Sequence, residues 1–199
     1  MYRKNKFFQC SPEYCLKRGD QAPYFEAEAY YRGLPIRVNL DQYAGSWLML
    51  FFYTADFTFV WPTELAAVAA LYEQFKSLGV EVLAVSTDSI WAHKIFAQTS
   101  PSGRQVQYPL VADRSQEISR KYGVLTPEGN APRATFLIDP EGIIQYYSVY
   151  PGPVGRNIYE LLRIFQALKF TERTNLGAPA NWCPGRPGVS RDWENVGKI

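Results

Sequence analysis

The first regular pattern along the chain is an alternation of apolar and polar residues over positions 24–30, where small or aromatic side chains alternate with two glutamates. This period of two is typical of a β-strand with one buried face. An Arg-Gly pair at 32–33 supplies a turn, and a second strand-like stretch covers 34–40. The pattern predicts a β-hairpin at the start of the fold.

Two continuous apolar runs, over 47–53 and 80–87, indicate strands that are buried on both faces. Between them, apolar residues recur at helical spacing from Leu65 to Leu78, and Gly79 supplies the helix stop. A strand, a helix and a second strand in this order predict a parallel crossover unit.

The remaining predicted elements are strands over 108–112, 134–138 and 143–149, short helices over 90–98 and 116–122, and an amphipathic helix over 157–169. An Asp-Pro-Glu-Gly turn joins the last two strands. The order fits an α/β, thioredoxin-like fold with a central mixed sheet flanked by helices. We predict an irregular lead-in over 1–14, one domain over 15–169, and an extended C-terminal arm over 170–199.

Composition narrows the class of protein. The chain carries 21 basic and 19 acidic residues, a net charge of +2, with no basic stripe for nucleic acid. Hydrophobic residues make up 47% of the sequence, enough for a sizeable core. The longest apolar run, 65–72, is far shorter than the roughly 20 residues of a membrane-spanning helix. The charged N-terminus leads into no apolar signal core, so we predict a cytoplasmic protein that contacts neither membrane nor nucleic acid.

Histidine and cysteine are scarce, which limits the chemistry. The chain has one histidine, His93, and three cysteines, Cys10, Cys15 and Cys183. A structural zinc site of four cysteines, or of two cysteines and two histidines, therefore lacks ligands. The spacing of Cys10 and Cys15 matches no strong metal or redox motif, and we interpret both as incidental thiols. We predict no metal and no cofactor.

Residues 51–64, FFYTADFTFVWPTE, resemble the active-site signature of the peroxiredoxins. The most similar group is the alkyl hydroperoxide reductase C/thiol-specific antioxidant type, the typical two-cysteine peroxiredoxins. The resemblance continues in order through EVLAVSTD, YPLVAD and RATFLID, at residues 81–88, 108–113 and 133–139. It implies a peroxiredoxin fold with a C-terminal arm, and thiol-dependent reduction of hydroperoxides as the activity of the family.

The sequence departs from the family pattern at its redox positions. Trp61 stands where the resemblance places the peroxidatic cysteine, and Thr54 stands where it places a proline. The resolving cysteine corresponds to Ala178, and Cys183 follows in the same stretch, APANWCPG. An indole N–H is a donor only, so Trp61 cannot act as the nucleophile.

Other site residues of the family are retained. The resemblance implies that Thr58 hydrogen-bonds the peroxide and that Arg133 is the pocket arginine. The residues also allow structural interpretations: Thr58 and Glu64 as helix-capping residues, Arg133 as the ion-pair partner of Glu64, and Trp61 as an aromatic residue that fills a disused cavity. For His93 we predict a position on a helix surface or at an interface.

The resemblance also implies an assembly. Members of the family form homodimers by pairing an edge strand, here expected at 143–149, and rings of such dimers resembling a decamer. Ring contacts would lie near the loops at 56–59 and 87–89. A protein client or a thiol reductant is a candidate partner.

Three functional hypotheses follow. The protein is a catalytically inactive homologue with a structural, scaffold or chaperone-like role. Alternatively, it is a thiol peroxidase that uses a relocated cysteine such as Cys183. In the third, it is an active peroxiredoxin disabled by substitution at Trp61. Departures at Thr54 and Ala178 as well favour natural divergence over one introduced change.

Overall fold

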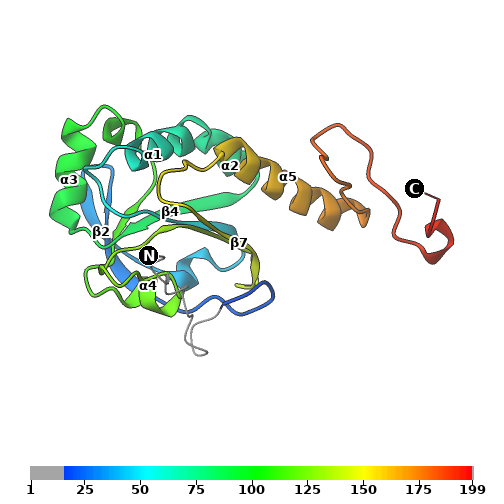
Figure 1. Cartoon of the computed structure of the whole chain (residues 1–199), viewed down its shortest axis with the longest axis horizontal. Coiled ribbons are helices and arrows are strands. Elements are labelled where there is room, and N and C mark those ends of the chain that lie inside the picture. Colours follow the sequence, from blue (N-terminus) through cyan, green and yellow to red (C-terminus); the bar gives the residue numbers. More distant parts are fainter. Residues whose placement is uncertain (1–15, 199) are drawn as a thin grey trace, which may run out of the picture.

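A computed structural model describes residues 16–198 of the chain. Its strands are β1 (Glu26–Tyr31), β2 (Leu34–Asn39), β3 (Trp47–Phe52), β4 (Val80–Ser86), β5 (Leu110–Ala112), β6 (Arg133–Ile138) and β7 (Ile144–Tyr150). Its α-helices are α1 (Trp61–Ala70), α2 (Tyr72–Ser77), α3 (Ile90–Thr99), α4 (Glu117–Lys121) and α5 (Ile158–Thr174). The strands form one mixed sheet in the order β2-β1-β5-β4-β3-β6-β7 (Figure 1).

The centre of the sheet follows from the two apolar runs. All six residues of β3 are buried, and β3 pairs in parallel with β4, with Leu50 opposite Leu83. The helices between them complete the predicted crossover unit. The predicted hairpin is also confirmed: β1 and β2 pair antiparallel around a turn in which Gly33 has a φ of 91°, a conformation that glycine adopts readily.

Alternate residues of β3 belong to two hydrophobic layers, one on each face of the sheet. Trp47, Met49 and Phe51 pack under α1, α2 and α5, whereas Leu48 and Leu50 pack on the opposite face with α4. Figure 1 shows α1, α2 and α5 above the sheet and α4 below it. The sheet is therefore covered on both sides, as the apolar runs require.

Two helices differ from the prediction. The helix expected over 65–78 starts earlier and breaks at Leu71 into α1 and α2. The helix expected to end at 169 continues to Thr174, where Asn175 ends it with a φ of 57°. Beyond Phe165 no residue of α5 is buried, so the hydrophobic period that marks a helix stops before the helix does.

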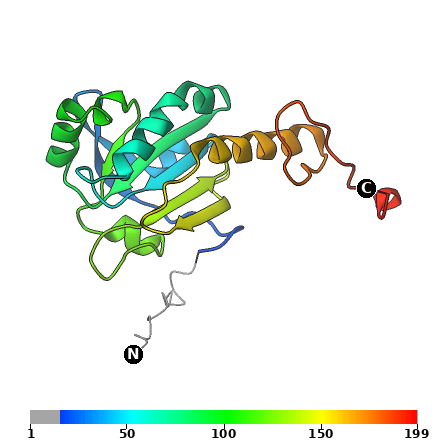
Figure 2. The same cartoon turned by 45° about the horizontal axis from the view of Figure 1, so that its top comes forward.

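After α5 the chain folds back on the helix end and forms the arm (Figure 2). Gly177 and Val189 make an isolated antiparallel bridge. Trp182 is buried against Phe170, with ring centroids 4.7 Å apart, and its carbonyl oxygen accepts a hydrogen bond from Arg163 Nη1 at 2.9 Å. None of the helices within residues 16–198 is both long and apolar enough to cross a membrane.

Phe165 anchors α5 to the domain, since its ring is buried in T-shaped contacts with Trp47 and Phe75. We expect Phe165→Ala to lower the free energy of unfolding by about 3–5 kcal/mol, the usual cost of removing a buried aromatic ring. Tyr159→Ala, at an exposed position of the same helix, should change it by less than about 0.5 kcal/mol. Urea denaturation measures both, and equal losses would contradict the anchoring role of Phe165.

Candidate functional site

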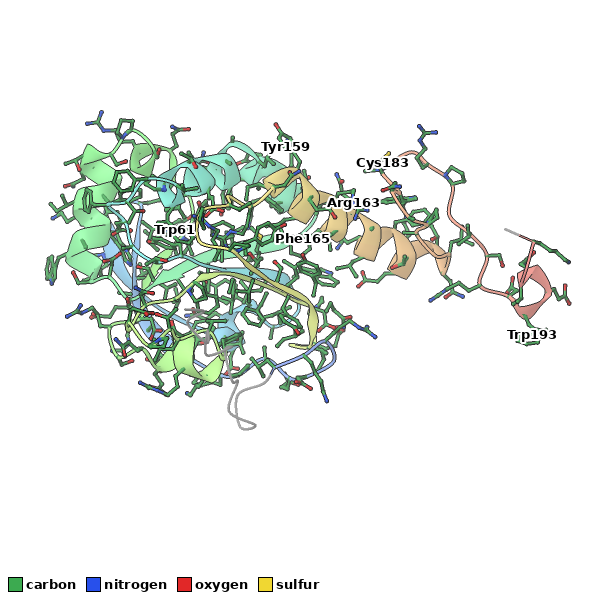
Figure 3. The ribbon with its side chains drawn as sticks, viewed as in Figure 1. Trp61, Tyr159, Arg163, Phe165, Cys183 and Trp193 are labelled. Atoms are coloured by element: carbon green, nitrogen blue, oxygen red, sulfur yellow. The ribbon has the colours of Figure 1, made fainter. Side chains whose placement is uncertain are left out.

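Trp61 is the first residue of α1, four residues before the start that the hydrophobic period predicted. The residue before it, Val60, makes no side-chain cap, and Pro62 occupies the first turn, where its missing N–H costs nothing. The Trp61 side chain is 9% exposed and belongs to the hydrophobic layer under α1 and α5. The Trp61 side chain thus lies in this buried layer at the start of α1, and Figure 3 labels its position.

Arg133, the first residue of β6, stacks on this indole. Its guanidinium carbon lies 3.4 Å from the centroid of the Trp61 ring, and the arginine is 1% exposed. Arg133 also donates from Nη1 to Glu64 at 2.6 Å and from Nη2 to the Gly152 carbonyl at 2.5 Å. A desolvated cation over an indole face is worth about 2 kcal/mol. The π face of Trp61 therefore covers one side of the pocket arginine.

Glu64 joins two buried arginines. Its Oε2 accepts from Arg133 Nη1 at 2.6 Å and from Arg156 Nη2 at 3.0 Å. Its Oε1 accepts from the Arg156 backbone N–H at 2.6 Å and from Nε at 3.1 Å. The ion pair predicted between Glu64 and Arg133 is present. Both carboxylate oxygens are engaged, so Glu64 is not a helix-capping residue.

Arg156 was not singled out by sequence reasoning. Its Nη1 donates to the carbonyls of Phe52 and Ala134 at 3.0 and 2.9 Å, and its guanidinium lies over the Phe51 ring. Burial lowers the pKa of Arg156 to about 10, against the opposing effect of Glu64, and the side chain stays cationic at pH 7. The one sequence feature that could have pointed to Arg156 is the Val-Gly-Arg stretch at 154–156, which resembles the family pattern.

The prediction for His93 is wrong: the side chain is fully buried on the sheet side of α3. His93 Nδ1 lies 2.8 Å from Asp56 Oδ2, and Nε2 lies 3.2 Å from the Val111 carbonyl. Tyr53 donates to the other Asp56 oxygen at 2.7 Å. Burial and the Asp56 charge raise the pKa of the Tyr53 hydroxyl well above its usual value. A histidine with two polar partners can replace an apolar residue on such a face.

Among the described residues, Asp56, Asp88 and His93 form a cluster whose ligand-type atoms lie within 4.8 Å of one another. Asp88 Oδ2 accepts from the Asp56 backbone N–H at 2.8 Å, and Ser86 donates to the same oxygen. Burial raises the pKa of the Asp88 carboxyl. These hydrogen bonds hold the loop after β3 against the start of α3, so the cluster has a structural role.

Two threonines, Thr54 and Thr58, hold the loop between β3 and α1 through hydrogen bonds to backbone carbonyls. Thr54 Oγ1 donates to the Ala131 carbonyl at 2.9 Å, a bond that a proline at this position cannot make. Thr58 Oγ1 donates to the Ala55 carbonyl at 3.2 Å and makes no cap bond to α1, so the capping interpretation of Thr58 is wrong.

Ala178 and Cys183 lie in the arm, beyond the end of α5, and Figure 3 shows Cys183 well away from Trp61. Within one chain, the structure does not bring the resolving position or its substitute to the start of α1. Cys183 is exposed. Cys10 and Cys15, together with the rest of the predicted lead-in, lie outside the described residues.

The order of strands and helices agrees with comparisons to known proteins. The sequence model of the AhpC/TSA family matches residues 18–147. The chain belongs to the AhpC/TSA family, the peroxiredoxins.

Peroxiredoxin relatives match nearly the whole chain. The selenocysteine-containing peroxiredoxin PrxU of Peptoclostridium acidaminophilum is 43% identical over 187 residues, which is 91% of this chain and 92% of the relative. The putative peroxiredoxin YkuU of Bacillus subtilis is 43% identical over 175 residues, covering 84% and 95% of the two chains.

Solved peroxiredoxin structures share the fold. The reduced 2-Cys peroxiredoxin of Plasmodium vivax has a TM-score of 0.82 and 35% identity, covering 89% of this chain and 93% of its own. AhpC of Mycobacterium tuberculosis has a TM-score of 0.76 and 34% identity, covering 84% and 98%. The predicted thioredoxin-like peroxiredoxin fold is confirmed.

Glu64 is the residue of this peroxiredoxin site whose loss should cost most. In Glu64→Gln, two buried arginines lose their shared counter-charge, and we expect the free energy of unfolding to fall by about 3–5 kcal/mol. Glu160→Gln breaks the half-exposed pair with Arg163 on α5 and should cost at most about 1 kcal/mol. Chemical denaturation compares the two; similar losses would contradict the role given to Glu64.

Proposed function

We propose that this protein is a catalytically inactive peroxiredoxin homologue with a structural, scaffold or chaperone-like role in the cytoplasm. The observation that carries the proposal is the buried Trp61 indole at the start of α1, stacked on Arg133. Two of the similar proteins, a 2-Cys peroxiredoxin and a selenocysteine-containing peroxiredoxin, are named for cysteine and selenocysteine.

The chemistry at this position supports loss of the peroxidase step. A thiolate attacks peroxide oxygen through a sulfur lone pair, and a helix start with a nearby cation stabilises that anion. Trp61 offers a π face and one N–H, with no lone pair that can be oxidised reversibly. Here the face of the Arg133 guanidinium lies against that ring, and its anionic partner is the Glu64 carboxylate.

A scaffold role is supported by exposed apolar surface in two places. Phe57, Phe59 and Trp91 are exposed near the loops proposed as ring contacts, Phe59 at 96%. Strand β7 is an outer strand of the sheet and carries the exposed side chains of Tyr147 and Val149. Clustered exposed aromatic residues and an open sheet edge favour a homodimer and a decamer-like ring of dimers.

The second candidate function is peroxide reduction through Cys183, favoured by its exposure to solvent. Its distance from Trp61 means that this thiol would act outside the retained pocket, without Arg133. Such a reaction would depend on an external thiol reductant. In the third hypothesis, substitution at Trp61 disabled an ordinary enzyme; Thr54 and Ala178 also differ from the family pattern, which argues against it.

We expect the protein to consume hydrogen peroxide no faster than an ordinary exposed cysteine does, because residues 16–198 place no thiol beside Arg133. Stopped-flow measurement with a thiol reductant tests this on the full chain and on Cys183→Ser. A fast reaction that Cys183→Ser abolishes would overturn the proposal in favour of the relocated thiol.

Trp61→Cys should restore peroxide reactivity well above that of the natural protein. The new thiol would lie at a helix N-terminus with Arg133 uncovered, which lowers its pKa below the reference of about 8.5. Trp61→Ser is the matched control, since it opens a similar cavity, costing about 3–5 kcal/mol, without a thiol.

Thiol titration and peroxide kinetics distinguish the outcomes. A folded Trp61→Cys protein whose thiol titrates and reacts like free cysteine would mean that Thr58, Glu64 and Arg133 no longer form a peroxide site. Turnover of the variant needs an external thiol, since Ala178 cannot resolve a sulfenic acid.

A further inference from the structure

A groove of about 900 Å³ lies along the last turns of α5, between this helix and the arm that turns back beside it (Figure 2). Its helical side comes from one face of α5, through Gln166, Lys169, Phe170 and Arg173. From Gln166 to Arg173 this face extends roughly 10 Å at 1.5 Å per residue. The groove is therefore elongated. It lies apart from the Trp61 site and has no part in the function proposed above.

The arm side of the groove is held in place by contacts within the chain. Trp182 accepts a hydrogen bond from Arg163 at its carbonyl, and its own Nε1 donates to the Arg186 carbonyl at 3.0 Å. Gly188 passes so close to Phe170 that a Cβ at this glycine would lie 2.7 Å from Phe170 Cζ. The groove is thus formed without a ligand, and an occupant does not have to order the arm before it binds.

The floor of the groove is apolar. The rings of Phe170 and Trp182 lie with their centroids 4.7 Å apart and their planes tilted by 32°. Leu78, at the end of α2, and two prolines of the arm, Pro184 and Pro187, extend this surface. A concave lining of aromatic and aliphatic side chains is typical of sites that bind the hydrocarbon part of a small molecule.

The charges that line the groove are mostly positive. Lys169, Arg173 and Arg186 contribute three cations, against one carboxylate from Glu172. Among residues 16–198, none of these four side chains takes part in an ion pair. Two of the cations are guanidinium groups, which match a carboxylate with two parallel hydrogen bonds. The lining therefore favours an occupant with a negative charge.

We propose that the groove binds the free anion of a long-chain carboxylic acid. The alkyl chain lies along α5 on the rings of Phe170 and Trp182, and the carboxylate is bound by the basic side chains. A compact anion such as phosphate would leave the apolar floor in water, and a neutral hydrocarbon would leave the cations without a partner. A single-chain carboxylate satisfies both parts of the lining, because it joins an extended apolar body to one anionic end.

Titration of the full chain with cis-parinarate, a long-chain carboxylate whose fluorescence rises in apolar surroundings, tests the proposal. The methyl ester of the same acid is the matched probe, since it keeps the chain and removes the charge. We expect the carboxylate to bind at least tenfold more tightly than the ester. Equal affinities would contradict a role of the cations, and no binding of either probe would contradict the site.

The basic side chains have their own test. The triple variant Lys169→Gln, Arg173→Gln and Arg186→Gln should lower the affinity for cis-parinarate about tenfold, to near that of the ester. The matched control is the triple variant Lys94→Gln, Arg114→Gln and Arg120→Gln, which removes three exposed cations outside the groove and should leave the affinity unchanged. Equal losses in the two variants would mean that only the net charge of the protein attracts the probe.

Photo-crosslinking locates the bound chain. A long-chain carboxylate that carries a diazirine should give adducts that mass spectrometry maps to residues 166–173 or 182–187. Adducts confined to other segments would assign the binding to a different surface. The natural source is tested with vesicles: stronger binding to phosphatidylglycerol vesicles than to phosphatidylcholine vesicles, without binding of the free carboxylate, would assign the cations to a lipid surface and overturn the proposal.

Discussion

The buried carboxylate of Glu64 is the interaction on which the rest of the site depends. It binds Arg133 at the start of β6 and Arg156 before α5, and so joins three segments that are distant in the sequence. Two guanidinium groups in a core need acceptors on every side, and here Glu64 and backbone carbonyls supply them. The position of α1, and with it that of Trp61, follows from this network.

The network explains how a tryptophan fits at the position where the resemblance to the family predicts a small thiol. Arg133 is held in the plane of its hydrogen bonds to Glu64 and Gly152, which leaves the flat faces of its guanidinium free. An indole can cover one of these faces without competing for its N–H groups. An indole at this position therefore keeps the surrounding polar contacts, and in the proposed function it stands where the reactive thiol would be.

The parts of the fold that sequence reasoning predicted are those that depend on local patterns. The apolar runs of β3 and β4 and the alternation in β1 report burial directly. The errors concern residues whose environment is set by distant partners. His93 can be buried because its ring nitrogens lie within hydrogen-bonding distance of Asp56 and of the Val111 carbonyl. The sequence around position 93 does not indicate either partner.

For the candidate site, too, local sequence patterns and distant contacts contribute differently to what could be predicted. The pair between Glu64 and Arg133 was predicted as the structural alternative to the family role of Arg133, since hydrophobic periodicity says nothing of a contact between residues 64 and 133. Arg156 was missed as a site residue, although it contributes more hydrogen bonds to the network than Arg133 does. The end of α5 was placed too early because a helix without a buried stripe has no period to reveal it.

The last turns of α5 have a mechanical consequence. The helix packs on the domain as far as Leu168 and carries the arm at its other end. From Leu168 to Thr174 it rises roughly 9 Å at 1.5 Å per residue. A rotation of the helix by about 10° where it packs on the domain therefore shifts the arm by roughly 1.5 Å over this length. The packing of Trp47, Phe75 and Phe165 thus sets, from inside the domain, where residues 175–198 are presented.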